Sequence, residues 1–160
     1  MEKITEVTAQ VLEREVIFTR TIDAPREAIY RAFTEREHVG HWWGPWGFTI
    51  TTHEMDVRPG GVWRFDMHGP DGTNYPNRIT YMEVSPPEWL RFKHGGDDDK
   101  LDEHFEVTVT FSACDGKTEL TMRSVFDSAE TLRQLIETVD AIEGGKQTLT
   151  RLADYVAKME

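Results

Sequence analysis

Four residues with reactive side chains share their strand phase with apolar residues. Arg20 is in phase with the apolar residues of EVIFTRTI, and His94 with those of WLRFKH. Tyr81 and Glu83 are in phase with Ile79 in NRITYMEV. Because side chains alternate between the two faces of a strand, we expect these groups to point inward. A guanidinium, an imidazole, a phenol and a carboxylate around an apolar cavity could orient a ligand carbonyl or act as acid and base.

The same residues also allow a purely structural interpretation. Arg20 and Glu83 could satisfy each other as a buried ion pair, or reach the rim of the interior. Strand phase alone does not bring the four side chains to one point. We therefore assign no catalytic residue from the sequence.

The stretch HVGHWWGPWGF, residues 38–48, holds three of the five tryptophans in the chain. Neighbouring residues on a helix lie about 100° apart, so Trp42 and Trp43 cannot point the same way. Trp42 falls on the expected buried face of a short helix over 35–43 and should anchor it. Trp43 and Trp46 are then expected to wall the entrance of a cavity. The alternative is that all three indoles plug the open end of the fold as core residues.

The histidines and the cysteine do not form a recognisable metal or redox site. His38 and His41 are three residues apart, which zinc sites permit, but we identify no acidic residue or cysteine that completes the pair. Cys114 is the only cysteine, which excludes a CxxC pair and an intramolecular disulfide. No nucleophile elbow or dinucleotide-binding fingerprint occurs. We therefore expect neither a metal nor a cofactor.

The composition limits the class of protein. With 160 residues, 38% hydrophobic and 29% charged, the chain is expected to form a single globular domain. Its formal net charge of −11 disfavours nucleic acid as a partner, because phosphate binding needs clustered lysines and arginines. No apolar run approaches the ~20 residues that span a bilayer, and the first residues lack the apolar core of a signal peptide. A cytoplasmic location is expected by default.

The apolar periodicity predicts an α+β chain of strand, two short helices, six strands and a final helix. In the first helix, Asp23 is the expected N-cap and Pro25 lies in the first turn. The second ends before Gly44, and Asp127 is expected to cap a segment after the last strand. The expected strands are 15–22, 48–57, 62–68, 77–84, 89–94, 104–111 and 118–126, and the final helix covers about 140–158.

The widths of these elements predict a curved sheet. Seven strands at ~4.8 Å spacing make a sheet about 30 Å wide, whereas one helix covers only about 10–12 Å of it. The sheet must therefore curl around the final helix. The adjacent Gly144 and Gly145 either leave room for a cavity between helix and sheet or allow the helix to cross tightly.

Several motifs, in this order and spacing, carry a resemblance to a known family. They are TRTIDAPREAIYRAFTE, HWWGPWGF, DVRPGGVWRFDM, YMEVSPPEWLRF, FEVTVTF, TELTM and EGGKQTLTRLADYVAK. The chain resembles the homologues of the activator of the 90-kDa heat-shock protein ATPase, within the START-like, helix-grip (SRPBCC) superfamily. The resemblance covers residues 14 to 158. Residues 1–13 match nothing and look like a polar N-terminal extension of a domain at 14–160.

The resemblance implies a helix-grip fold with a hydrophobic cavity between the sheet and the C-terminal helix. It implies binding of a small hydrophobic ligand, such as a lipid, a polyketide or another apolar metabolite. The alternatives are a cyclase-like or hydrolytic enzyme using the same cavity, and a co-chaperone that stimulates a heat-shock ATPase. A protein partner and either a monomer or a homodimer fit this resemblance.

Strand phase and the family resemblance together give a set of expected cavity residues. The set is Arg20, Trp43, Trp46, Phe48, Trp63, Phe65, Met67, Tyr81, Glu83, Phe92, His94, Phe105, Val107, Met122, Gly145 and Leu149.

Overall fold

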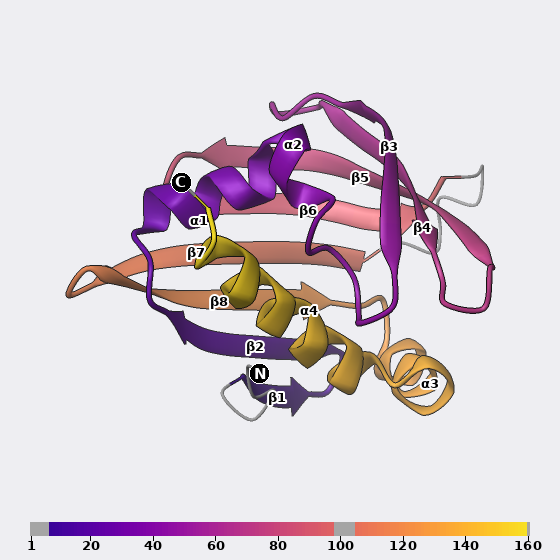
Figure 1. The fold of residues 1–160 in the computed structure, drawn as a ribbon. Helices are drawn as coiled ribbons and strands as arrows, with labels where there is room; N and C mark the ends of the chain where they lie inside the picture. Colours follow the sequence, from indigo (N-terminus) through magenta and orange to yellow (C-terminus); the bar gives the residue numbers. More distant parts are fainter. Residues whose placement is uncertain (1–6, 98–104, 160) are drawn as a thin grey trace.

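A computed structural model describes residues 7–97 and 105–159. In these ranges an antiparallel sheet of eight strands, in the order β1-β2-β8-β7-β6-β5-β4-β3, curves around helix α4 (Figure 1). The strands are β1 (Thr8–Leu12), β2 (Glu15–Ile22), β3 (Thr49–Met55), β4 (Val62–His68), β5 (Asn74–Ser85), β6 (Trp89–Gly96), β7 (Phe105–Cys114) and β8 (Lys117–Val125). The helices are α1 (Arg26–Thr34), α2 (Arg36–Val39), α3 (Ala129–Val139) and α4 (Ala141–Val156). The expected α+β helix-grip class is confirmed.

The first strand of the sheet, β1, lies within the stretch expected to be a polar extension. It pairs with β2 through Leu12 and Glu15, so the chain reverses over two residues. Glu13 takes a positive φ of 49° in this turn. Asn or Gly ordinarily marks such a turn, and TAQVL has no clear apolar alternation, so the sequence gives no hairpin signal here. The sheet therefore has eight strands instead of seven, and residues 1–6 lie outside the described part.

The final helix, α4, fills the concave side of the sheet. Its apolar stripe buries Leu149, Leu152 and Val156, and the helix packs against β1, β2, α1 and α3. A Cβ atom at Gly145 would overlap the ring of Phe18 on β2. The glycine thus allows a tight crossing of helix and sheet, and no cavity opens at this point.

The helix starts differ from the expected ones. Helix α1 begins after Pro25, two residues beyond the expected cap at Asp23. Helix α3 is capped by Ser128, not by Asp127, because the Ser128 hydroxyl accepts a hydrogen bond from Thr131 N at 3.1 Å. Asp140, in the left-handed conformation with φ 50°, separates α3 from α4.

The expected helix over 35–43 is only four residues long, since α2 ends at Val39. Trp42 nevertheless anchors this region, as predicted. Its indole is buried, donates to the Ala32 carbonyl at 3.0 Å and meets Phe33 edge-on at a centroid distance of 4.7 Å. Helices α1 and α2 lie over the same face of the sheet as α4, near its C-terminal end (Figure 1), and Trp42 holds the segment after α2 against α1.

The loop that carries the tryptophans is tied to α4 by a single arginine. The guanidinium of Arg151 lies 2.8–3.4 Å from the carbonyl oxygens of His41, Trp43, Gly44, Pro45 and Phe48. Partial burial lowers the pKa of Arg151. The carbonyl groups take the place of water as partners of the cation, so the loop and the helix hold each other.

Among the described residues, no helix is long and apolar enough to cross a membrane.

Candidate ligand cavity beside α3

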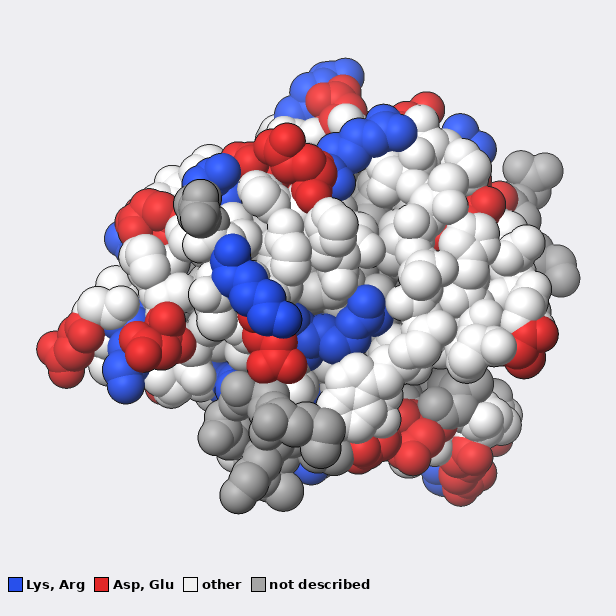
Figure 2. Space-filling model, in the orientation of Figure 1, with Lys and Arg blue, Asp and Glu red and all other residues white. Residues whose placement is uncertain are grey.

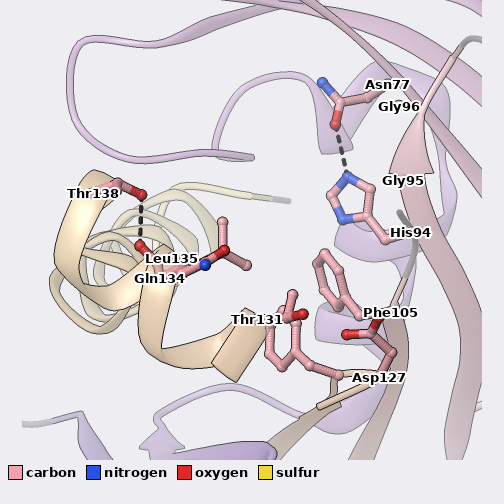
Figure 3. Close-up of a pocket in the computed structure, with 11 residues that line it drawn as sticks. Asn77, His94, Gly95, Gly96, Phe105, Asp127, Thr131, Gln134, Leu135 and Thr138 are labelled. Atoms are coloured by element: carbon pink, nitrogen blue, oxygen red, sulfur yellow. Dashed lines mark hydrogen bonds between the residues drawn. The ribbon is translucent and has the colours of Figure 1, made fainter. Parts of the chain in front are cut away.

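A cavity of about 740 Å³ lies between α3 and the ends of β5, β6 and β7 (Figure 3). The strands reach it on the side of the sheet where α3 follows β8, away from α1 (Figure 1). Its lining residues are Asn77, His94, Gly95, Gly96, Phe105, Phe126, Asp127, Thr131, Gln134, Leu135 and Thr138. The cavity thus lies beside α3 instead of under α4, where it was expected.

His94 is the most chemically distinctive residue of this lining. The paired strands β6 and β5 bring it opposite Ile79, on the inner face that its phase predicted. Its Nε2 atom lies 2.9 Å from Asn77 Oδ1 (Figure 3). Burial lowers the pKa of His94 to about 4, so the imidazole is neutral at physiological pH.

The rings around His94 hold its imidazole in place. The Phe105 ring lies 5.1 Å from it, and those of Trp43 and Phe65 lie 6.0 Å away, all between centroids. Phe105 in turn stacks on Phe126 at 4.7 Å. Aromatic side chains from β4, β7 and the loop after α2 thus form a rigid apolar wall behind the imidazole.

The opposite wall comes from one face of α3. Thr131, Gln134, Leu135 and Thr138 follow each other at intervals of three, one and three residues, which places them on one side of a helix. The Thr138 hydroxyl donates to the Gln134 carbonyl at 2.6 Å, so its proton is used within the helix. None of these four residues was among those expected from the sequence, although their spacing along one helical face is the signal that could have found them.

The cavity is poor in positive charge. Its described lining contains no lysine or arginine, and Asp127 is its one carboxylate, on the exposed rim. Figure 2 shows acidic side chains over the end of the molecule where α3 lies. The described lining therefore contains no positively charged partner for an anionic ligand.

Most of the other expected cavity residues pack against one another in the core. Trp63 stacks on Phe65 at 3.9 Å, and Trp43 meets Trp63 edge-on at 5.0 Å. These large rings pack against one another and fill the space in which the sequence predicted a cavity. The buried members are Arg20, Trp43, Trp63, Phe65, Tyr81, Phe92, Val107 and Leu149, and the partly buried ones are Phe48, Met67, Met122 and Gly145. Of the sixteen expected residues, His94 and Phe105 lie in the lining of the described cavity.

Glu83 does not point inward as its strand phase predicted. The register of β5 and β6 shifts between Tyr81 and Glu83, so a bulge reverses the strand phase at this point. Glu83 is exposed and pairs with Arg91 at 3.1 Å, whereas Tyr81 is buried. Arg20 is buried whereas Glu83 is exposed, so the two do not form the buried ion pair that the sequence allowed.

The two tryptophans expected at the entrance lie elsewhere. Trp43 is buried behind His94, and the His94 ring lies between its indole and the cavity. Trp46 is 44% exposed, and its backbone N–H donates to Gln147 Oε1 at 3.1 Å. Neither is among the lining residues of the described cavity.

The histidine pair considered for zinc has other contacts. In the described part of the chain, Glu35, Glu37 and His38 bring their potential ligand atoms within 4.8 Å of one another, so nearby carboxylates exist after all. His38 Nδ1 lies 2.7 Å from the Tyr155 hydroxyl and its Nε2 lies 3.4 Å from Glu35. His41 stacks on the Tyr155 ring at 5.3 Å. These contacts tie α2 to α4.

A curved antiparallel sheet that grips a C-terminal helix, with a cavity at one end, defines a helix-grip domain. The sequence model of the family described as Activator of Hsp90 ATPase homolog 1-like protein matches residues 23–157, so the chain belongs to this family. Membership supports a ligand-binding domain in general. None of the curated proteins compared with the chain matches it.

Solved structures share the fold over nearly the whole chain. A protein from Arthrobacter aurescens is 20% identical, with a TM-score of 0.87 over 98% of this chain and 94% of that one. A protein from Mycobacterium smegmatis is 25% identical, with a TM-score of 0.84 over 96% and 98% of the two chains. The AHSA1 protein from Silicibacter pomeroyi is 23% identical, with a TM-score of 0.72 over 90% and 98%.

Proposed function

We propose that this protein binds a small, mostly apolar molecule in the cavity between α3 and the ends of β5, β6 and β7. The observation that carries the proposal is the cavity itself, with stacked phenylalanines and a neutral imidazole on one wall. Its volume of about 740 Å³ falls within the range of roughly 300–1,000 Å³ typical of ligand pockets. Lipids, polyketides and other apolar metabolites are the ligands that the superfamily resemblance suggests.

The lining favours binding over catalysis. Of the four reactive residues whose strand phase pointed inward, only His94 is among the described lining residues of the cavity. A general base works best when its pKa lies near the working pH. With a pKa of about 4, His94 is a weak base at neutral pH, and no second acid or base from that set stands beside it. The cyclase-like or hydrolytic alternative therefore has less support than a carrier or sensor.

The proposal needs no particular oligomeric state and no protein partner. The cavity is built within one chain, from β5, β6, β7 and α3. We retain the cytoplasmic location and the monomer or homodimer as part of the proposal. Stimulation of a heat-shock ATPase, which the family name suggests, is a separate activity, and the geometry of the cavity is no evidence for it.

The test is to fill the cavity and measure binding of a neutral apolar fluorophore, N-phenyl-1-naphthylamine. Leu135→Trp adds bulk on the α3 face that lines the cavity. Arg133→Trp makes the same side chain on an exposed position of the same helix and is the matched control. We expect Leu135→Trp to weaken fluorophore binding at least about tenfold while the control binds as the wild type does.

Denaturant unfolding of both variants shows whether the fold is retained. A folded Leu135→Trp protein that binds the fluorophore as tightly as the wild type contradicts the proposed site. Native mass spectrometry of the freshly purified wild type and of Leu135→Trp adds an independent measurement. A co-purifying small molecule should be present on the first and missing from the second.

A further inference from the structure

The hydrogen-bond network beside the cavity determines which nitrogen of His94 carries the proton. The Asn77 side-chain NH₂ donates to the Tyr75 carbonyl at 2.7 Å, which orients the amide. Its oxygen then faces His94 Nε2 at 2.9 Å and accepts from it. Since the buried imidazole is neutral, its one proton lies on Nε2 and Nδ1 keeps a lone pair.

The second nitrogen is directed into the cavity. His94 Nδ1 has no hydrogen-bond partner among residues 7–97 and 105–159. Figure 3 shows this atom pointing from β6 towards the space in front of α3. The ring cannot turn over without losing the bond to Asn77, and the rings of Phe105, Phe65 and Trp43 surround it. A molecule that covers this acceptor without donating to it leaves the acceptor unpaired, which is costly, so a molecule in the cavity gains by donating to Nδ1.

The other lining groups limit the ligand's charge and shape. No lysine or arginine lines the described cavity, and Asp127 on its rim repels a carboxylate or phosphate. The protein's net charge of −11 acts in the same direction. The stacked pair of Phe105 and Phe126 offers its aromatic wall to a flat, uncharged ring.

We propose that the cavity selects an uncharged aromatic molecule carrying a hydroxyl group, whose proton is donated to Nδ1 of His94. This inference rests on the proposed function and narrows its ligand to one chemical class. His94 is in this view the residue that determines specificity, while the apolar walls supply most of the affinity. A ligand of the same size without a donor binds more weakly, because it leaves Nδ1 without a hydrogen bond.

The test compares 1-naphthol with 1-methoxynaphthalene, which differ by one methyl group that removes the donor. Isothermal titration with the wild type should give a dissociation constant about tenfold lower for 1-naphthol. 1-Naphthoate, which adds a negative charge, should bind more weakly than either. In His94→Phe both neutral naphthalenes should bind with the same affinity, because the acceptor is gone and an apolar ring replaces it.

Thr138→Val is the matched control. It removes a hydroxyl from the same cavity, but that hydroxyl already donates within α3, so the preference for 1-naphthol should persist. Equal affinity of the wild type for the two neutral naphthalenes, or a preference that survives in His94→Phe, overturns this inference and leaves the proposed function standing. Failure of a folded wild-type protein to bind N-phenyl-1-naphthylamine and both naphthalenes overturns the two together.

Discussion

Mild acid should destabilise this protein through His94. Burial holds its pKa at about 4 in the folded protein, against about 6.5 in an unfolded chain. Between these two pKa values the His94 imidazole is protonated in the unfolded chain but not in the folded protein. The free energy of unfolding therefore falls as the pH falls. Applied from about pH 7 to about pH 5, the linkage relation gives a loss of about 2 kcal/mol for this one residue.

The described carboxyl groups with a lowered pKa contribute mainly below this window. The carboxyls with a lowered pKa, such as Asp71 beside the Thr73 backbone N–H, lose their stabilisation only below their ordinary pKa of about 4. Asp127, the other ionisable side chain among the described lining residues, lies on the exposed rim of the cavity. The other histidines are the same in the wild type and in a His94→Gln variant, so the difference between the two proteins above about pH 5 isolates the contribution of His94.

The assay is urea unfolding at the two pH values for wild type, His94→Gln and Thr138→Val. Glutamine does not titrate and retains an N–H that can donate to Asn77. The wild type and Thr138→Val should lose about 2 kcal/mol more than His94→Gln on acidification. An NMR titration should show the His94 ring signals unchanged over the same interval. Equal losses in wild type and His94→Gln would mean that the imidazole is not held neutral, and the assignment of Nδ1 as an acceptor would fail with it.

Four further substitutions test the packing of α4 and of the segment after α2 by denaturant unfolding. Gly145→Ala should cost about 1–3 kcal/mol because its methyl group overlaps the Phe18 ring, whereas Gly144→Ala, whose methyl group would meet only Pro45 Cγ at 3.4 Å, should be neutral or stabilising by up to about 1 kcal/mol. Equal effects of the two alanines would contradict the tight crossing. Arg151→Met should cost about 2 kcal/mol by removing the donor to five carbonyl oxygens, and a change below about 0.5 kcal/mol would show that water replaces it readily. Trp42→Ala should cost about 3–5 kcal/mol, and a mild effect would contradict its role as anchor.

The regular parts of the fold were predictable because their patterns repeat. Strand alternation identified the seven longer strands and placed His94 inward, and the apolar stripe identified α4. Trp42 followed from its place on a helical face. Local periodicity and the widths of sheet and helix were therefore enough to predict a curved α+β sheet, whereas the helix-grip class was implied by the family resemblance.

The cavity was less predictable because it depends on irregularities and on contacts between distant residues. The bulge after Tyr81 turns Glu83 outward, and nothing in NRITYMEV marks it. A glycine is required at position 145 because any Cβ atom there would overlap the ring of Phe18, which is far away in the sequence. The polar face of α3 was visible as a spacing, but its position opposite His94 depends on the break at Asp140.

The two ends of the curved sheet differ in how firmly they are joined to the central helix. At one end, Arg151 binds the tryptophan loop to α4 through several carbonyl groups, so that the loop and helix can move only as one body. At the other end, α3 continues into α4 through the single left-handed residue Asp140. Displacement of α3 requires rotation at Asp140 and exposure of the buried Leu132, whereas displacement of the loop requires extraction of an arginine from a ring of carbonyl oxygens. We therefore expect α3, and not the tryptophan loop, to be the element that moves when a molecule enters or leaves the cavity.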